Sequence, residues 1–458
     1  MNEDRSIDQT SISYDGNRLS RRTLLKYGAA FALGAPIIAA CSSSSTSTAS
    51  ASHVTKGLPS SGKVRWSYEA GFYQTSYQAV IAQLQKQHPG IKVPLVTQVG
   101  PSNDIPMINA IKAGVADLIT TKNPKFQYLD PMLTGRQKLL IPLNDYYQAY
   151  GWKEYLTPST TSQGTRDGNI YTVTFYLEGP GVAYRPSVLK KLGAQVPTTW
   201  AEFLDLLGRA KAAGKIPMAS GVQPLSFLVM IHNMIWASEN PNSITDIIFG
   251  NGKWTDGPCA EAAQSCVDLW NKGYIDHDAP SLTITQAQAR FQAGQAVTNL
   301  TGTWAFASMQ DAFSQDYGLF TAPSPNAAPR WSLGEDQSQS IPYNSTDPGT
   351  AAAVLDYSIR GTGAQIFAQH GNLMATKAAV AYEQPQTKVV PVTSPDIGLY
   401  LYGWLPVGSQ NAWMNGFTEM LQGKLTPSAW SQQIQAAWER DEQSGNLPSA
   451  AERTAIPH

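Results

Sequence analysis

Carboxylates and aromatic rings stand close together at several points of this sequence. Tyr68 and Glu69 end the first stretch with a strand pattern, and Tyr176 and Glu178 lead into a Gly-Pro-Gly loop. A third point is the segment 302–304, in which Trp304 follows a glycine and a threonine. Flat rings can stack on the C–H faces of a sugar and carboxylates accept hydrogen bonds from its hydroxyl groups, so this mixture suits a neutral, hydroxylated ligand.

The first 41 residues carry the elements of an export signal. Arg21 and Arg22 form a twin-arginine pair, and the uncharged run 27–40 follows. That run is shorter than the roughly 20 apolar residues that span a bilayer, and it fits the apolar region of a signal peptide. It ends in Ile-Ala-Ala-Cys at Cys41, the pattern of a bacterial lipobox whose cysteine is acylated. We predict a twin-arginine lipoprotein signal over 1–41 and a flexible Ser/Thr/Ala-rich tether over 42–62.

The composition of the 458-residue chain excludes several classes of protein. A net charge of −1 gives no basic excess for nucleic acid, and no apolar stretch after Cys41 has the length of a membrane helix. A hydrophobic fraction of 42% indicates a globular protein. The remaining chain of about 400 residues exceeds one ordinary core, which predicts two lobes.

The two cysteines besides Cys41 raise the question of a disulfide bond. Cys259 and Cys266 lie seven residues apart, which on a continuous helix separates their Cα atoms by roughly 10 Å. A disulfide needs a separation within about 7 Å. The spacing favours two free, buried thiols, and a disulfide remains open only if Cys259 precedes its helix.

Strand and helix patterns alternate along the first part of the globular region. The stretches 63–67, 91–99 and 116–120 are strand-like. Helices are expected between them, one with Tyr77, Ile81 and Leu84 on its buried face and one over 105–113. Strands are expected again over 171–175 and 181–184. This alternation predicts an α/β fold with a parallel sheet covered by helices.

Three helix starts are predicted from capping chemistry. Segment 199–202 is a capping box, and Asp347 and Thr426 are each followed by a proline at the first helical position. The apolar stripe of the last helix is expected to consist of Trp430, Ile434 and Trp438.

An ordered series of short motifs runs through the chain from residue 63 nearly to its end. Its members are 114–118, 140–146, 167–171, 193–203, 291–296, 302–304 and 420–428. By this series the chain resembles the family 1 extracellular solute-binding proteins, the relatives of maltose-binding protein. Ala116 and Thr174 depart from the pattern, because the family has proline at both places.

The resemblance implies a two-lobed periplasmic-binding-protein fold of type II with a hinged interlobe cleft. Lobe one would comprise 63–164 and 331–375, and lobe two 165–330 and 376–458. The implied function is high-affinity, extracytoplasmic binding of a mono- or oligosaccharide and its delivery to the permease subunits of an ABC importer. The protein would be a monomer anchored through Cys41 to the outer face of the cytoplasmic membrane, without cofactor or metal.

The resemblance also sharpens the candidate site. In the family the tryptophan of the Gly-x-Trp turn stacks on the ligand, and an acidic residue at the position of Glu178 faces the cleft. The segment 334–336 corresponds to a Gly-Gly turn of the family at the cleft, although only Gly334 is kept. The candidate ligand-binding residues are Trp304, Glu178, Tyr176, Tyr68, Glu69, Asp336, Glu335, Trp404 and Gln410.

Two alternatives remain open at the level of sequence. A lipid-anchored, carbohydrate-active enzyme would need two opposed carboxylates roughly 5 to 9.5 Å apart, which Glu178, Glu69 or Asp336 could supply. The six histidines form no metal-binding pattern and no Gly-x-Ser-x-Gly elbow occurs, so we predict binding without catalysis. A solute-binding protein for a polyol or a glycerol phosphate is the second alternative.

Overall fold

The computed structural model describes residues 54–69, 73–97, 104–121, 130–133, 138–156, 158–222, 227–376, 390 and 397–448. Arg21, Arg22 and Cys41 lie outside these ranges, and with them the predicted export signal and lipid anchor. Among the described helices, none combines the length and the apolar character needed to cross a membrane.

A six-stranded sheet begins with three parallel strands. β2 (Trp66–Tyr68) lies between β4 (Leu95–Thr97) and β5 (Leu118–Thr121). Because all three run in the same direction, their carboxyl ends meet at one edge of the sheet. Tyr68 therefore ends its strand at this edge, and Glu69 follows it directly.

Later strands complete this sheet in the opposite direction. β13 (Ser332–Ser340) pairs antiparallel with β5 and with β8 (Val173–Glu178), and β14 (Gly398–Leu399) runs parallel to the start of β13. The expectation of a parallel sheet is thus correct for β2, β4 and β5 and wrong for the whole. The long β13 returns across the sheet against β5, a pairing of segments more than 200 residues apart that local patterns do not encode.

A four-stranded sheet follows in the middle of the sequence. Its order is β10 (Ile216–Ala219), β11 (Ala296–Gly302), β9 (Pro180–Tyr184) and β12 (Gly318–Phe320). β10 and β11 are parallel, whereas β9 is antiparallel to both of its neighbours. Only Gly179 separates β9 from β8, so the chain passes from one sheet to the other at this glycine.

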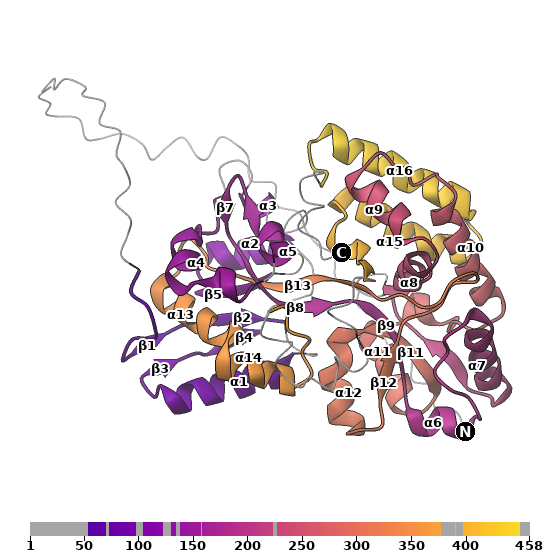
Figure 1. Cartoon of the computed structure of the whole chain (residues 1–458), viewed down its shortest axis with the longest axis horizontal. Helices are drawn as coiled ribbons and strands as arrows, with labels where there is room; N and C mark the ends of the chain where they lie inside the picture. Colours follow the sequence, from indigo (N-terminus) through magenta and orange to yellow (C-terminus); the bar gives the residue numbers. More distant parts are fainter. Residues whose placement is uncertain are drawn as a thin grey trace, which may run out of the picture. The chain divides into compact units, whose positions relative to one another are not determined.

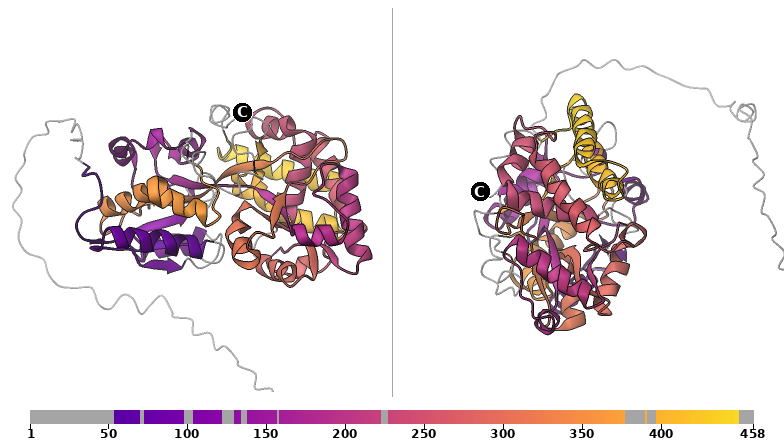
Figure 2. Two further views of the ribbon diagram at one scale, coloured as in Figure 1. Left: turned by 60° about the horizontal axis from the view of Figure 1, so that its bottom comes forward. Right: turned by 90° about the vertical axis from the view of Figure 1, so that its right-hand side faces the viewer.

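The helices cover the two sheets as separate groups (Figure 1). We call the six-stranded sheet with α1, α13 and α14 the first lobe, and the four-stranded sheet with α6 to α12, α15 and α16 the second lobe. In the first lobe α14 packs on both α1 and α13, and Figure 2 shows the indigo and orange helices side by side. In the second lobe α8 packs on β9 and on α10, and α16 packs on α10 and α15.

Apart from the strands given above, the elements up to residue 170 and between 348 and 369 are β1 (Gly62–Lys63), α1 (Gln74–Gln87), β3 (Ile91–Lys92), α2 (Asp104–Lys112), α3 (Asp130–Leu133), α4 (Asn144–Tyr150), η3 (Trp152–Glu154), α5 (Pro158–Gln163), β6 (Thr165–Arg166), β7 (Asn169–Ile170), α13 (Pro348–Ile359) and α14 (Gly361–Gln369). The remaining elements are α6 (Pro186–Lys191), α7 (Trp200–Ala212), η4 (Phe227–Val229), α8 (Met230–Glu239), α9 (Pro241–Phe249), α10 (Pro258–Asn271), η5 (Ala279–Ser281), α11 (Ile284–Gln292), η6 (Thr303–Ala305), α12 (Phe306–Phe313), η9 (Leu401–Gly403), α15 (Val407–Leu421) and α16 (Pro427–Gln443).

The predicted helix starts are confirmed where capping chemistry decides them. Thr199 and Glu202 form the reciprocal capping box of α7. Asp347 accepts a hydrogen bond from the backbone N–H of Thr350 at the start of α13, and Thr426 caps α16 in the same way. The buried stripe of α16 contains Trp430, Ile434 and Trp438, as expected.

Two predicted strands are each divided in the structure. The stretch 63–67 corresponds to β1 and β2, and 91–99 corresponds to β3 and β4. Pro94 lies between β3 and β4. Its carbonyl accepts a hydrogen bond from the backbone N–H of Trp66 at 3.0 Å, but proline has no N–H with which to continue the ladder.

The prediction of two free thiols is confirmed. Cys259 and Cys266 are both buried and both unoxidised. α10 begins at Pro258, so both cysteines lie within one continuous helix, which holds their Cα atoms too far apart for a disulfide.

The core of the first lobe contains a buried amide that is fully hydrogen-bonded. The side-chain oxygen of Gln339 accepts from Trp66 Nε1 at 2.8 Å and from Thr120 Oγ1 at 2.9 Å. Its nitrogen donates to Tyr77 Oη at 3.1 Å and to the carbonyl of Gln337 at 3.2 Å. A buried polar group is destabilising unless it is paired, and here four bonds satisfy both ends of the amide.

The core of the second lobe contains a buried imidazole instead. His232 accepts a hydrogen bond at Nδ1 from Trp413 Nε1 at 3.3 Å, and its Nε2 lies 3.0 Å from the carbonyl oxygen of Cys259. Because an indole only donates and a carbonyl only accepts, the ring is the neutral Nε2–H tautomer. Burial among the rings of Trp236 and Trp430 lowers the pKa of His232 to about 4.

Candidate functional site

The carboxyl edge of the first sheet holds the first two candidate residues. Tyr68 is buried, and its ring lies 5.3 Å from the ring of Tyr77 on α1. Glu69, one residue beyond the strand, is half-buried. One oxygen of its carboxylate accepts a hydrogen bond from Gln337 Nε2 at 2.9 Å. The carboxylate is thus held at the strand end rather than pointing freely into solvent.

The last residues of β8 bring the next two candidates to the same region. Tyr176 and Glu178 are 1% and 3% exposed, so neither is a surface residue. Tyr73, which precedes α1, stacks on Tyr176 with ring centroids 5.4 Å apart, and its hydroxyl donates a hydrogen bond to the carboxylate of Glu178. Burial raises the pKa of Tyr176 well above its usual value, which keeps that phenol neutral.

Glu335 and Asp336 lie on β13 beside these residues. In the antiparallel register, position 336 faces Tyr176, position 335 faces Leu177, and Gly334 faces Glu178. The backbone therefore places both acidic residues next to β8, but their side chains lie outside the described part of the structure.

Trp304 enters the region from the second lobe. It lies in η6, directly after β11, and is 7% exposed. The turn is fastened to Gly179: the backbone N–H of Thr303 donates to its carbonyl at 3.0 Å, and Thr303 Oγ1 accepts from its N–H at 3.2 Å. A side chain at Gly302 would come within 2.2 Å of the Trp304 ring, so this turn requires glycine. The turn that carries Trp304 is thereby hydrogen-bonded to Gly179, the residue that follows Glu178.

An aromatic group extends from Trp304 towards the C-terminal segment. Its ring meets that of Phe227 edge-on at 5.4 Å, and Phe227 stacks on Tyr402 at 6.2 Å. Gln410 joins the group by donating a hydrogen bond to the carbonyl of Tyr402 at 3.2 Å. Trp404, by contrast, is buried and packs edge-on against Phe249 of α9 at 4.9 Å.

Four residues of this region were not among the candidates chosen from the sequence: Tyr73, Phe227, Tyr402 and Gln337. Tyr402 stands two residues before the candidate Trp404, and Tyr73 follows Tyr68 and Glu69 closely, so both had a local signal. Phe227 and Gln337 had none, because their contacts with Trp304 and Glu69 join segments 77 and 268 residues apart in the sequence.

A comparison of the sequence with known families identifies the family of this chain. The model of the bacterial extracellular solute-binding proteins matches residues 70–360, which is more than half of the chain. The chain belongs to this family. No curated protein sequence matches this solute-binding protein.

Solved structures with the same fold are plentiful among sugar-binding proteins. A chitin oligosaccharide binding protein shares 20% identity, covers 83% of this chain and 99% of its own, and has a TM-score of 0.68. The maltose-bound MalE3 of T. maritima shares 17% identity over 83% and 99% of the two chains, with a TM-score of 0.66. The MalE domain of Bdellovibrio bacteriovorus bound to maltotriose shares 17% over 83% and 100%, with a TM-score of 0.64. These proteins establish the two-lobed periplasmic-binding-protein fold for this chain.

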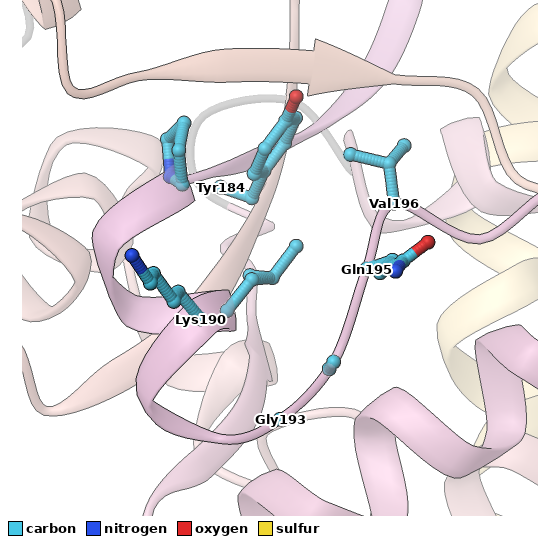
Figure 3. Close-up of a pocket in the computed structure, with 8 residues that line it drawn as sticks. Tyr184, Lys190, Gly193, Gln195 and Val196 are labelled. Carbon is cyan, nitrogen blue, oxygen red and sulfur yellow. The ribbon is translucent and has the colours of Figure 1, made fainter.

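This solute-binding protein also has a surface pocket away from the candidate residues. It encloses about 470 Å³ between α6 and the segment 193–196 (Figure 3). Its lining consists of Tyr184, Pro186, Leu189, Lys190, Gly193, Ala194, Gln195 and Val196. This lining offers one ring but no carboxylate, whereas the strand ends at Gly179 bring rings and carboxylates together. We therefore place the candidate ligand site at the strand ends.

Carboxylates and aromatic rings are the side-chain groups that the strand ends bring together. Glu69 and Glu178 carry acceptor oxygens, and Tyr68, Tyr176 and Trp304 carry flat rings, all of them buried or half-buried. Within the described ranges no three His, Cys, Asp or Glu side chains are grouped so as to hold a metal ion.

Proposed function

We propose that this solute-binding protein captures a mono- or oligosaccharide outside the cytoplasmic membrane and delivers it to an ABC importer. The observation that carries the proposal is the convergence at Gly179. Glu178 precedes this glycine, the turn bearing Trp304 is hydrogen-bonded to it, and Tyr176 lies two residues before Glu178.

The two kinds of side chain would divide the recognition of a sugar between them. Trp304 would stack on the C–H face of a ring, while Glu178 and Glu69 would accept hydrogen bonds from hydroxyl groups. Tyr68, Tyr176, Glu335, Asp336 and Gln410 would complete the site, with Trp404 contributing through the C-terminal segment.

The crossing strands supply a route for closure. Between β8 and β9 the chain passes from the first lobe to the second through Gly179 alone, and it returns between β12 and β13. We propose that the sugar lies in a cleft between the lobes and that rotation about these crossings encloses it.

Known ligands of proteins with this fold support a carbohydrate. The solved structures named above are described as binding chitin oligosaccharide, maltose and maltotriose. We extend that class to this chain because its candidate residues are acidic and aromatic rather than basic, which disfavours a phosphorylated solute.

A panel of sugars tests the proposal directly. The purified protein is melted with chitin oligosaccharide, maltose, maltotriose and raffinose, and the sugar that raises the melting temperature most is titrated by calorimetry. We expect saturable binding of at least one sugar and its recovery unchanged. No binding across the panel, or turnover of the sugar at about 1 per second or more, would refute a role in sugar capture.

Replacement of Trp304 locates the site in the same experiment. Loss of a stacking ring is worth about 1 to 3 kcal/mol, so Trp304→Ala should weaken sugar binding roughly 5- to 150-fold. Trp438→Ala is the matched control, since Trp438 is 6% exposed and packs on Trp254 in the second lobe. Both variants should lose stability, but only Trp304→Ala should lose affinity. Equal affinity of the two variants would place the sugar elsewhere.

Membrane attachment makes a separate prediction. We propose that Arg21 and Arg22 direct export and that Cys41 carries the acyl chains that anchor the mature, monomeric protein. Cys41→Ser should move the protein from the membrane fraction to the soluble extracytoplasmic fraction or block its processing, because the acylated thiol is gone. Mass spectrometry of the mature N-terminus and fractionation measure this. Membrane retention of the variant with an unmodified N-terminus would contradict a lipid anchor.

A further inference from the structure

Gln337 has an unusual backbone for a residue inside a strand. Its φ is +54°, in the left-handed region that side chains other than glycine rarely occupy. Among the described residues three other non-glycines have positive φ: Lys138, Asp167 and Ser314. None of these three lies within a strand or helix. Gln337 is also completely buried, so its conformation is imposed by its surroundings.

The residue lies at a joint in β13. Positions 338–340 pair with β5 in the first lobe, whereas positions 334–336 pair with β8 alone and 332–333 pair with β14. The left-handed residue therefore stands where β13 leaves β5. Its side chain is carried past the carboxyl end of β5 towards the end of the neighbouring parallel strand β2.

At that end the side chain meets Glu69. Gln337 Nε2 donates a hydrogen bond to Glu69 Oε2 at 2.9 Å. Glu69 follows β2 directly and is half-buried, so this bond fixes the direction of a carboxylate at the edge where the candidate ligand residues lie.

The other end of Gln337 is held by the core. Its carbonyl accepts a hydrogen bond from Gln339 Nε2 at 3.2 Å, and Gln339 is itself bonded to Trp66, Thr120 and Tyr77. A strained backbone persists only where neighbouring contacts over-determine it, and strain of this kind gathers at binding sites. The core amide of the first lobe thus connects through Gln337 to Glu69.

We propose that Gln337 is a positioning residue for the ligand site: its left-handed backbone and its amide hold the Glu69 carboxylate in the orientation that receives a sugar hydroxyl. The inference rests on the proposed capture of a sugar and adds to it a residue that does not itself touch the ligand. A pre-oriented acceptor lowers the entropy lost on binding, so affinity depends on Gln337 through Glu69.

Gln337→Gly removes the amide and keeps a residue that accepts the left-handed backbone. Glycine adopts positive φ without strain, which offsets part of the cost of emptying the space of this completely buried side chain, so the variant should melt at a lower temperature but remain folded where the titration is made. Its affinity for the best sugar of the panel should fall about 2- to 10-fold, as expected when one side chain must be ordered by the ligand. Ser314→Gly is the control, because Ser314 has a φ of +58° at the end of α12 and should leave affinity unchanged.

The same substitution in a Glu69→Ala background decides whether Gln337 acts through Glu69. We expect no further loss of affinity there, since the carboxylate to be positioned is gone. Equal losses in the presence and absence of Glu69, or no loss in either, would overturn the inference while leaving sugar capture intact. Failure of the native protein to bind any sugar of the panel is a different result, which refutes the proposed function and this inference with it.

Discussion

The cores of the two lobes satisfy the same physical demand with different chemistry. In the first lobe the buried polar group is the amide of Gln339, which makes four hydrogen bonds. In the second lobe it is the imidazole of His232, held between an indole N–H and a carbonyl. Both groups are paired, but an amide does not titrate and an imidazole does. The pairing of Gln339 is therefore independent of pH, and the pairing of His232 is not.

Charged groups reinforce the contrast. In the first lobe Asp117 accepts hydrogen bonds from the Arg65 side chain at 2.8 Å and from Thr346, and these bonds hold the pKa of its carboxyl well below the usual range despite its burial. That stabilisation is present above the ordinary carboxyl pKa, so it is lost only below about pH 4. As the pH is lowered, the stabilisation linked to His232 should therefore be lost before that linked to Asp117.

The largest effect is expected from removing the amide of the first lobe. Gln339→Leu leaves the Trp66 indole, the Thr120 hydroxyl and the Tyr77 phenol without that partner, which should destabilise the fold by roughly 4 kcal/mol. Gln288→Leu is the control, because Gln288 makes a single side-chain bond, to Ser308 Oγ at 2.8 Å. Denaturant unfolding measures both variants. Equal and small losses would show that the four bonds of Gln339 contribute little.

The next effect is the acid sensitivity of the second lobe. Histidine in the unfolded chain is protonated near pH 6.5, whereas His232 in the folded protein is protonated only near pH 4. The free energy of unfolding therefore decreases as the pH is lowered through this window. The total loss in the free energy of unfolding should be about 3 kcal/mol once His232 is protonated. His232→Phe should be less stable at pH 7 but should lose this slope.

Melting curves between pH 7.5 and pH 4.5 measure the slope. His277→Phe is the matched control, because His277 is exposed and stacks on Trp270 at the surface, and it should keep the slope of the native protein. A native melting temperature that stays level over this range would remove the distinction between the two cores.

The smallest effects test whether the lobes respond separately. Thr199→Ala removes the cap of α7 in the second lobe, and Asp347→Ala removes the cap of α13 in the first. Each should cost about 1 kcal/mol. Hydrogen exchange should show faster exchange near α7 for one variant and near α13 for the other. Matching losses in both lobes from either variant would indicate a single cooperative unit.

Local chemistry was predictable from the sequence, and pairing between distant segments was not. The caps of α7, α13 and α16 follow from a side chain and the backbone three residues later, so a short window contains both partners. The antiparallel return of β13 depends on partners in β5 and β8, which lie far away in the sequence. The alternation of elements therefore gave the fold class but not the direction of every strand.

The same limit applies to the site. Glu178 and Trp304 could be singled out because their motifs are local and resemble those of a known family. The contacts that hold these two residues could not be predicted, because they join distant segments. The Tyr73 hydroxyl donates a hydrogen bond to Glu178 across 105 residues of sequence, and the backbone N–H of Gly179 donates one to Thr303 Oγ1 across 124. The burial of Trp304 could not be predicted either, because Phe227, whose ring it meets edge-on, comes from a different segment.

The hydrogen bond between Trp66 and Gln339 spans 273 residues and sets an order of events during synthesis. At about 5 to 20 residues per second, Trp66 waits on the order of 15 to 55 s for its partner to be made. All four strands of the second sheet lie between residues 180 and 320 and are complete before Gln339 appears. A nascent chain released after residue 320 but before residue 339 can therefore contain every strand of the second sheet, but its first lobe will lack the amide around which the core closes.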